Sequence, residues 1–143
     1  MIKIRFLKSE KLKLIKHTFV DPTKECGGFL FGRIKHNSND IVCDIDFIYY
    51  ELLFGTAGEF NFNISYIARA RSFVSNDYST NLIGTYHSHG NYPASFSEID
   101  RNKLQKYFGA NKITMIYSPK TGKLIADFMD ENYCSHKARI ITK

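Results

Sequence analysis

Residues 27–50 read GGFLFGRIKHNSNDIVCDIDFIYY, and this stretch decides the fold. Its first part, Gly27–Ile34, is apolar and rich in glycine, which is typical of a strand that another backbone or a ligand approaches closely. Its second part, Asp40–Tyr50, alternates in polarity and predicts a second long strand. The polar residues Asn37–Asp40 predict a turn between them, so we expect a hairpin.

Further strands and helices are predicted on both sides of this hairpin from the period of the apolar residues. The predicted strands are Ile2–Phe6, Leu82–His89, Lys112–Tyr117 and Lys123–Met129, and the predicted helices are Ser9–Thr18, Asn63–Ser75 and Glu98–Phe108. Ser9 and Ser97 stand at the cap positions of two of these helices. The mixed order of elements predicts an α/β fold class, with a single mixed β-sheet flanked by helices.

Length and composition limit the class of protein. The chain has 143 residues, of which 43% are hydrophobic and 15% aromatic, so intrinsic disorder is excluded. Because there is no repeat or low-complexity tract, we expect residues 1–143 to form one domain. Uncharged apolar runs fall short of the ~18 residues that a membrane span needs. Charged residues interrupt residues 1–10, where a signal peptide would be apolar, so we expect a cytoplasmic protein without membrane contact.

The charge is concentrated at one end of the chain. The net charge is +6, and residues 1–18 carry six basic residues against one acid. This pattern fits either a solvated helix face or a surface that attracts nucleic acid or an acidic protein. No aromatic residues are interleaved with these bases as in a groove for single strands, so nucleic acid is the less expected partner.

The three cysteines, Cys26, Cys43 and Cys134, form no C-x-x-C pair and are expected to be reduced thiols. Any metal site must therefore use histidine and carboxylate. Cys26 is interpreted as a buried, inert thiol, with redox sensitivity as the alternative.

One group of residues has the types and spacing of a metal site: His87-Ser88-His89, then seven residues, then Ser97-Glu98-Ile99-Asp100. On a strand, His87 and His89 point to the same face, and Asp100 in the first turn of the next helix can supply a third ligand. Two imidazoles and one carboxylate suit a zinc ion with an open fourth position. Taken separately, the histidines also fit ordinary strand residues, and Ser97 with Asp100 fits a helix capping box.

Glu25 precedes the glycine pair in Glu-Cys-Gly-Gly-Phe-Leu-Phe-Gly, residues 25–32. It is either a solvated strand end or the general base that a zinc hydrolase needs.

Together, these residues resemble the signature of the JAMM (MPN-plus) zinc metalloprotease family, in a compact form similar to its prokaryotic members. The spacing of Glu25, His87, His89, Ser97 and Asp100 matches the family, and residues 2–129 resemble its catalytic domain. Two positions depart from the commoner pattern. Tyr86 stands where Trp often precedes the first histidine, and Gly90 stands where Pro often follows the second.

The resemblance implies a JAMM/MPN architecture, which is related to that of cytidine deaminases, and a role for each motif residue. His87, His89 and Asp100 would bind one zinc ion per chain. Glu25 would take a proton from the activated water and deliver it to the leaving amine, and Ser97 would hold the oxyanion. Zinc deaminases themselves are excluded, because their Pro-Cys-x-x-Cys motif is absent.

The resemblance further implies an isopeptidase or peptidase that cleaves an amide bond at the C-terminal tail of a ubiquitin-like or sulfur-carrier protein. A narrower form is a deconjugase in a prokaryotic conjugation or anti-phage system. The tail would lie along a sheet edge, and residues 55–59 and 90–96 are candidate flanking loops. The alternatives are a DNA-repair-associated protein of the RadC type and a non-catalytic MPN scaffold.

Overall fold

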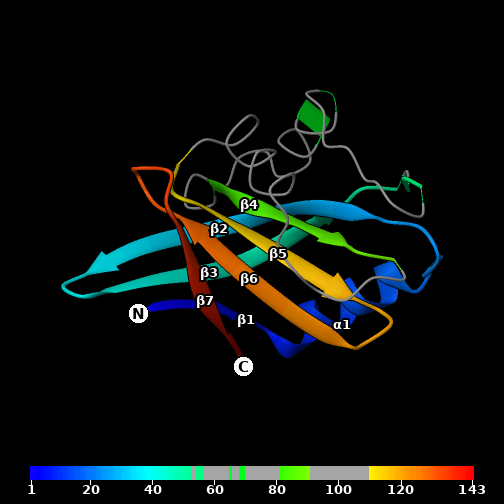
Figure 1. Ribbon diagram of the computed structural model, residues 1–143, viewed down its shortest axis with the longest axis horizontal. Coiled ribbons are helices and arrows are strands. Elements are labelled where there is room, and N and C mark those ends of the chain that lie inside the picture. The colour runs from blue at the N-terminus through cyan, green and yellow to red at the C-terminus, as the bar shows by residue number, and fades with distance from the viewer. Residues whose placement is uncertain (53, 57–64, 66–67, 70–80, 91–109) are drawn as a thin grey trace.

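The structure is a computed structural model that describes residues 1–52, 54–56, 65, 68–69, 81–90 and 110–143 (Figure 1). The elements with defined bounds in this part of the chain are seven strands and one helix. In order they are β1 (Ile2–Phe6), α1 (Lys8–Thr18), β2 (Gly27–Asn37), β3 (Asp40–Tyr50), β4 (Asn81–Ser88), β5 (Lys112–Ser118), β6 (Lys123–Met129) and β7 (Ser135–Thr142).

The seven strands form a closed barrel in the order β1-β3-β2-β4-β5-β6-β7. The first strand closes it, because β1 pairs in parallel with β3 on one side and with β7 on the other. The β4–β5 pair is also parallel, whereas β2 pairs antiparallel with both β3 and β4. The twist of the strands around the barrel is visible in Figure 1.

The predicted fold class, an α/β domain with one sheet flanked by helices, is therefore wrong. The described chain is mainly strand with one short helix, and its sheet closes on itself. The closing strand β7 was not predicted, because Ala138 is its only buried residue and its apolar pattern is weak. The predicted helices Asn63–Ser75 and Glu98–Phe108 fall outside the described residues, apart from Ser65, Ala68 and Arg69, which are helical.

Helix α1 covers one part of the barrel interior with Leu14 and Thr18, which are its two buried residues. It begins at Lys8 after Leu7, which makes no side-chain capping bond, so the prediction that Ser9 caps this helix is wrong. Most of the α1 lysines are exposed, as the solvated-face interpretation expects. Across the described ranges, no helix combines the length and the hydropathy that crossing a bilayer requires.

The predicted hairpin is confirmed, and its glycines show why β2 needs them. β2 and β3 pair from Asn37↔Asp40 to Gly28↔Tyr50, with a bulge after Phe31. A Cβ atom at Gly32 would lie 1.9 Å from the carbonyl oxygen of Asp44. The close approach expected from the sequence is thus made by the neighbouring backbone of β3.

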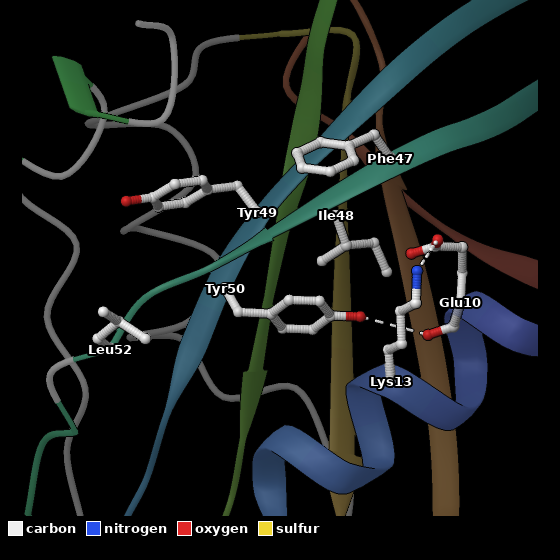
Figure 2. A pocket seen from close by; sticks show the side chains of 7 residues that line it. All are labelled: Glu10, Lys13, Phe47, Ile48, Tyr49, Tyr50 and Leu52. Carbon is white, nitrogen blue, oxygen red and sulfur yellow. Dashed lines mark hydrogen bonds and ion pairs between the residues drawn. The ribbon is translucent and has the colours of Figure 1, made fainter. Parts of the chain in front are cut away.

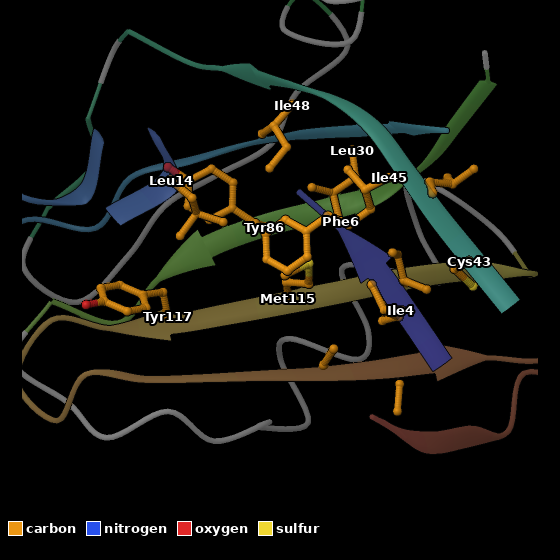
Figure 3. Close-up of a cluster of buried hydrophobic side chains, with 14 of the residues drawn as sticks. Ile4, Phe6, Leu14, Leu30, Cys43, Ile45, Ile48, Tyr86, Met115 and Tyr117 are labelled. Atoms are coloured by element: carbon orange, nitrogen blue, oxygen red, sulfur yellow. The ribbon is translucent and has the colours of Figure 1, made fainter. Parts of the chain in front are cut away.

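The barrel interior is the hydrophobic core (Figure 3). Ile4 and Phe6 of β1, Leu30 of β2 and Phe128 of β6 are at most 1% exposed. Figure 3 shows Tyr86 projecting from β4 into the same interior. Because side chains alternate along a strand, Tyr86 and Ser88 face inward while His87 between them faces outward.

Candidate functional site

Two histidine side chains come together at the end of β4. The Nε2 atoms of His87 and His89 are 3.2 Å apart, and their ring centroids are 5.1 Å apart. Two nitrogen ligands of one tetrahedral zinc ion, at 2.0–2.1 Å each, lie about 3.3 Å from one another. The two imidazoles therefore already have the separation that a shared zinc ion requires, which is also the separation of an N–H···N hydrogen bond.

Glu25 lies two residues before β2, the strand that pairs with the histidine-bearing strand β4. In the β2–β4 ladder Gly27 is opposite His87, and the Ser88 N–H donates to the Cys26 carbonyl at 2.9 Å. The ladder ends at Gly27↔His87, and Glu25 and His89 each lie two residues beyond this pair. The Cys26 and Ser88 side chains contact each other on the inner face at 3.5 Å, so alternation places Glu25 with the two histidines on the outer face.

The backbone of Glu25 is held from a second side. Its N–H donates to the Thr56 carbonyl at 2.8 Å, and its carbonyl accepts from the Gly55 N–H at 2.8 Å. The residue is only 7% exposed, so the carboxylate is not a solvated strand end. Of the two interpretations of Glu25, the structure favours a buried carboxylate near the histidine pair.

The remaining motif residues, Ser97 and Asp100, lie outside the described residues. Within the described ranges, no group of three or more histidine, cysteine or acidic residues is arranged to hold a metal ion. Of the candidate flanking loops, only residues 55–56 and 90 are described. Gly90 has φ of +56°, which proline cannot adopt. The departure from the commoner family pattern at this position therefore matches a different turn after His89.

Behind the histidines, the inner face of the same strands carries a cluster of polar side chains that the sequence analysis did not predict. The Cys26 Sγ lies 3.5 Å from Ser88 Oγ and 3.6 Å from the Tyr86 hydroxyl. The Tyr86 hydroxyl also contacts Nδ1 of His17, from α1. The contacts of Tyr86 and Ser88 with Cys26 and His17 span 60 or more positions in the sequence. Only the period-two placement of Tyr86 and Ser88 around His87 therefore hinted at the cluster.

Burial sets the protonation of this cluster. It lowers the pKa of His17 and raises the pKa of Cys26 and that of Tyr86. His17 is therefore neutral near pH 7, with a single N–H. Its Nε2 lies 2.8 Å from the Glu51 carbonyl, which can only accept, so Nε2 carries the proton and Nδ1 accepts from Tyr86. Cys26 is fully buried and protonated, in line with the interpretation of a buried thiol.

Glu51 is a buried carboxylate close to the start of β2. It is 1% exposed, and its N–H donates to the Gly27 carbonyl at 3.0 Å. Arg69 forms an ion pair with one of its carboxylate oxygens at 3.2 Å. Burial raises the pKa of Glu51, and the Arg69 charge offsets part of this effect.

A cavity of about 430 Å³ opens elsewhere, between α1 and the second half of β3 (Figure 2). Its lining residues are Glu10, Lys13, Phe47, Ile48, Tyr49, Tyr50 and Leu52. The Tyr50 hydroxyl donates to the Glu10 carbonyl at 3.3 Å, and Lys13 pairs with the Glu10 carboxylate at 3.1 Å. Of the predicted site residues that the structure describes, Glu25, His87 and His89, none lines this cavity, so we separate it from the histidine site.

Comparisons with known proteins agree with the motif. A family model described as prokaryotic homologs of the JAB domain matches residues 8–129. Among solved structures, the chain is similar to the solution structure of protein DSY2949 from Desulfitobacterium hafniense. The TM-score is 0.71 at 19% identity, covering 98% of this chain and 92% of that one, which shows a shared fold. No protein with a curated description matches the sequence.

Proposed function

Because the chain belongs to the family of prokaryotic homologs of the JAB domain, we propose that it is a zinc-dependent isopeptidase or peptidase. Its proposed substrate is an amide bond at the C-terminal tail of a ubiquitin-like or sulfur-carrier protein. The observation that carries the proposal is the 3.2 Å separation of the His87 and His89 Nε2 atoms, on the same face as Glu25. The same separation suits a hydrogen bond between two histidines, so the metal measurement below distinguishes the two cases.

His87 and His89 would hold the zinc ion, with Asp100 as the third ligand. When bound there, zinc would polarise the amide carbonyl and make water acidic enough to attack it at neutral pH. Neutral imidazoles and a carboxylate are the donor set that zinc uses in hydrolases.

Glu25 would carry the proton. The residue is 7% exposed and lies two positions beyond the pairing of Gly27 with His87. From there its carboxylate would accept a proton from the attacking water and transfer it to the leaving amine. The paired backbone at Thr56 and Gly55 holds it in place, so the base needs little reorganisation during the reaction. Ser97 would donate a hydrogen bond to the oxyanion.

We place this activity in the cytoplasm. Cys26, Cys43 and Cys134 are all free thiols, which a reducing compartment preserves. The proposed partner is the tailed substrate protein alone, without nucleic acid or membrane.

The first experiment measures zinc per chain by elemental analysis in the wild type, Asp100→Ala and His87→Ala. His36→Ala is the matched control, because His36 is an exposed histidine on β2 far along the strand from the site. We expect about one zinc per chain in the wild type and the control, and its loss in the other two. A wild type that takes up no metal from added zinc would contradict the site.

The second experiment measures cleavage of a fluorescent amine from the C-terminus of a ubiquitin-like protein and of a sulfur-carrier protein. Glu25→Gln should retain zinc while its kcat falls roughly 10²–10⁴-fold, because the carboxylate acts as the base and not as a ligand. Normal turnover in Glu25→Gln would show that the base is another group. A zinc-loaded wild type that cleaves neither tail would contradict the peptidase proposal and favour the scaffold.

A further inference from the structure

We propose that Ser88, Tyr86 and His17 are positioning residues for the site. They form a buried chain of polar contacts on the inner face of β2 and β4, and this chain fixes the strand ends that carry Glu25, His87 and His89 on the outer face. The contacts stand on the structure alone, whereas their consequence for catalysis rests on the proposed function.

Ser88 forms the central clamp, between the two histidines. Its backbone N–H donates to the Cys26 carbonyl at 2.9 Å, and its side-chain Oγ accepts the Cys26 N–H at 3.0 Å. In a regular antiparallel pair, the backbone carbonyl would accept that second bond. Here the Ser88 hydroxyl accepts the bond instead of the Ser88 carbonyl. The next residue, His89, donates its N–H to the Tyr117 carbonyl of β5 at 3.1 Å.

Because the Ser88 hydroxyl replaces the backbone carbonyl as acceptor, β4 can separate from β2 at the motif while the buried Cys26 N–H keeps its hydrogen bond. Cys26 and Ser88 are both 0% exposed, so an unpaired Cys26 N–H would have no access to water. Residue 25 follows directly from the clamped Cys26, and His87 and His89 flank the clamped Ser88. The single hydroxyl therefore sets the position of all three outward-facing groups.

Tyr86 and His17 anchor the clamp to the rest of the fold. The fully buried Tyr86 hydroxyl donates to His17 Nδ1 and lies 3.6 Å from Cys26 Sγ. His17 in turn donates from Nε2 to the Glu51 carbonyl at 2.8 Å. Since the N–H of Glu51 donates to Gly27 at 3.0 Å, the chain of contacts returns to β2 two residues from Glu25. Helix α1 is thus tied to both strands of the site.

The test compares Ser88→Ala with Ser88→Thr, which keeps the hydroxyl, in the full-length protein. Two readouts report the histidine pair: the ring-nitrogen NMR signals of His87 and His89 without metal, and the affinity and visible absorption spectrum with Co²⁺. We expect Ser88→Ala to shift the ring signals and to weaken Co²⁺ binding about tenfold. Ser88→Thr should return both readouts to near the wild-type values.

Two further variants separate positioning from general stability. Thr114 lies on the neighbouring strand β5, and its buried hydroxyl has no hydrogen-bond partner among the described residues. Thr114→Val should therefore leave the ring signals and Co²⁺ affinity unchanged. Tyr86→Phe keeps the ring but removes the donor to His17, and it should weaken Co²⁺ binding roughly fivefold.

Unchanged ring signals and Co²⁺ affinity in folded Ser88→Ala and Tyr86→Phe would overturn the proposal. An equal effect in Thr114→Val would overturn it as well. If the wild type binds no Co²⁺, the proposed function fails, but the metal-free ring signals still decide whether Ser88 positions the histidines.

Discussion

Gly84 pairs with Ile113 of β5, three residues before His87, and replacing it with alanine tests how tightly that pair of strands is packed. A Cβ atom at this position would lie 2.0 Å from the Ile113 carbonyl oxygen and 2.8 Å from its carbonyl carbon. Side-chain carbons essentially never approach another atom below 3.0 Å, so the strands must separate by the difference, about 1 Å.

The magnitude follows from that separation. Overpacking of a close-packed interior costs about 1–3 kcal/mol. A backbone hydrogen bond stretched by about 1 Å is lost, and a buried N–H or C=O left unpaired costs about another 1–3 kcal/mol. We therefore expect Gly84→Ala to lower the free energy of unfolding by about 2–5 kcal/mol, a large part of the 5–15 kcal/mol typical of a domain.

The assay is urea unfolding followed by circular dichroism, with Gly122→Ala as the matched control. Gly122 has φ of +72° but open space around its Cβ position, so only the conformational cost of about 1–2 kcal/mol applies there. A Gly84→Ala variant that loses no more stability than Gly122→Ala would refute the steric reasoning. The same variant should also weaken Co²⁺ binding, because β4 carries both histidines.

Two predictions concern the pH dependence of stability. Burial raises the pKa of Glu51 above its ordinary value of 4.5, so the wild type loses stability as pH rises through that raised pKa. Glu51→Gln should therefore be more stable than the wild type at pH 7, and the difference should vanish below pH 4.5. Urea unfolding across pH 4–8 measures this difference. A wild type whose stability rises relative to that of the variant as pH rises would contradict the prediction. Asp44 changes stability with pH in the opposite direction, because hydrogen bonds from Arg5 at 2.7 and 2.9 Å lower its pKa below 3.8. Asp44→Asn should be modestly less stable than the wild type at pH 7, and this loss should disappear as pH falls through the lowered pKa of Asp44. A loss that is equal at pH 7 and pH 2 would show that the charge of Asp44 is not its source.

The hairpin could be predicted because its information is local. Alternating polarity over Asp40–Tyr50, the polar turn before it and the glycines of β2 all lie within 24 residues, and each has one structural meaning. The two histidines could be predicted to share a face for the same reason, since a strand fixes the direction of residues two apart.

The closure of the barrel could not be predicted, because β7 is specified by its neighbours and not by its own pattern. Ser135, His136 and Lys137 are exposed at its start, and Ala138 is its only buried residue. Its place is set by the pairing of Arg139–Thr142 with Lys3–Phe6, almost the whole chain away. The polar contacts behind the site escaped prediction in the same way, because His17 meets Tyr86, and Cys26 meets Ser88, only once the barrel exists.

The parallel pairing of β1 with β7 has a consequence for the order of events during synthesis. The bonds at this seam include Lys8 N–H to the Lys143 carbonyl at 2.9 Å and Lys143 N–H to the Phe6 carbonyl at 3.0 Å. Among the described elements, β1 is thus made before the others, yet it can complete its ladder only with β7, which is made after them. Until then β1 presents an open edge to other nascent chains, and contacts this distant in sequence form slowly. We therefore expect the seam between β1 and β7 to be the last part of the barrel to form, with the β1 edge exposed to aggregation until it does.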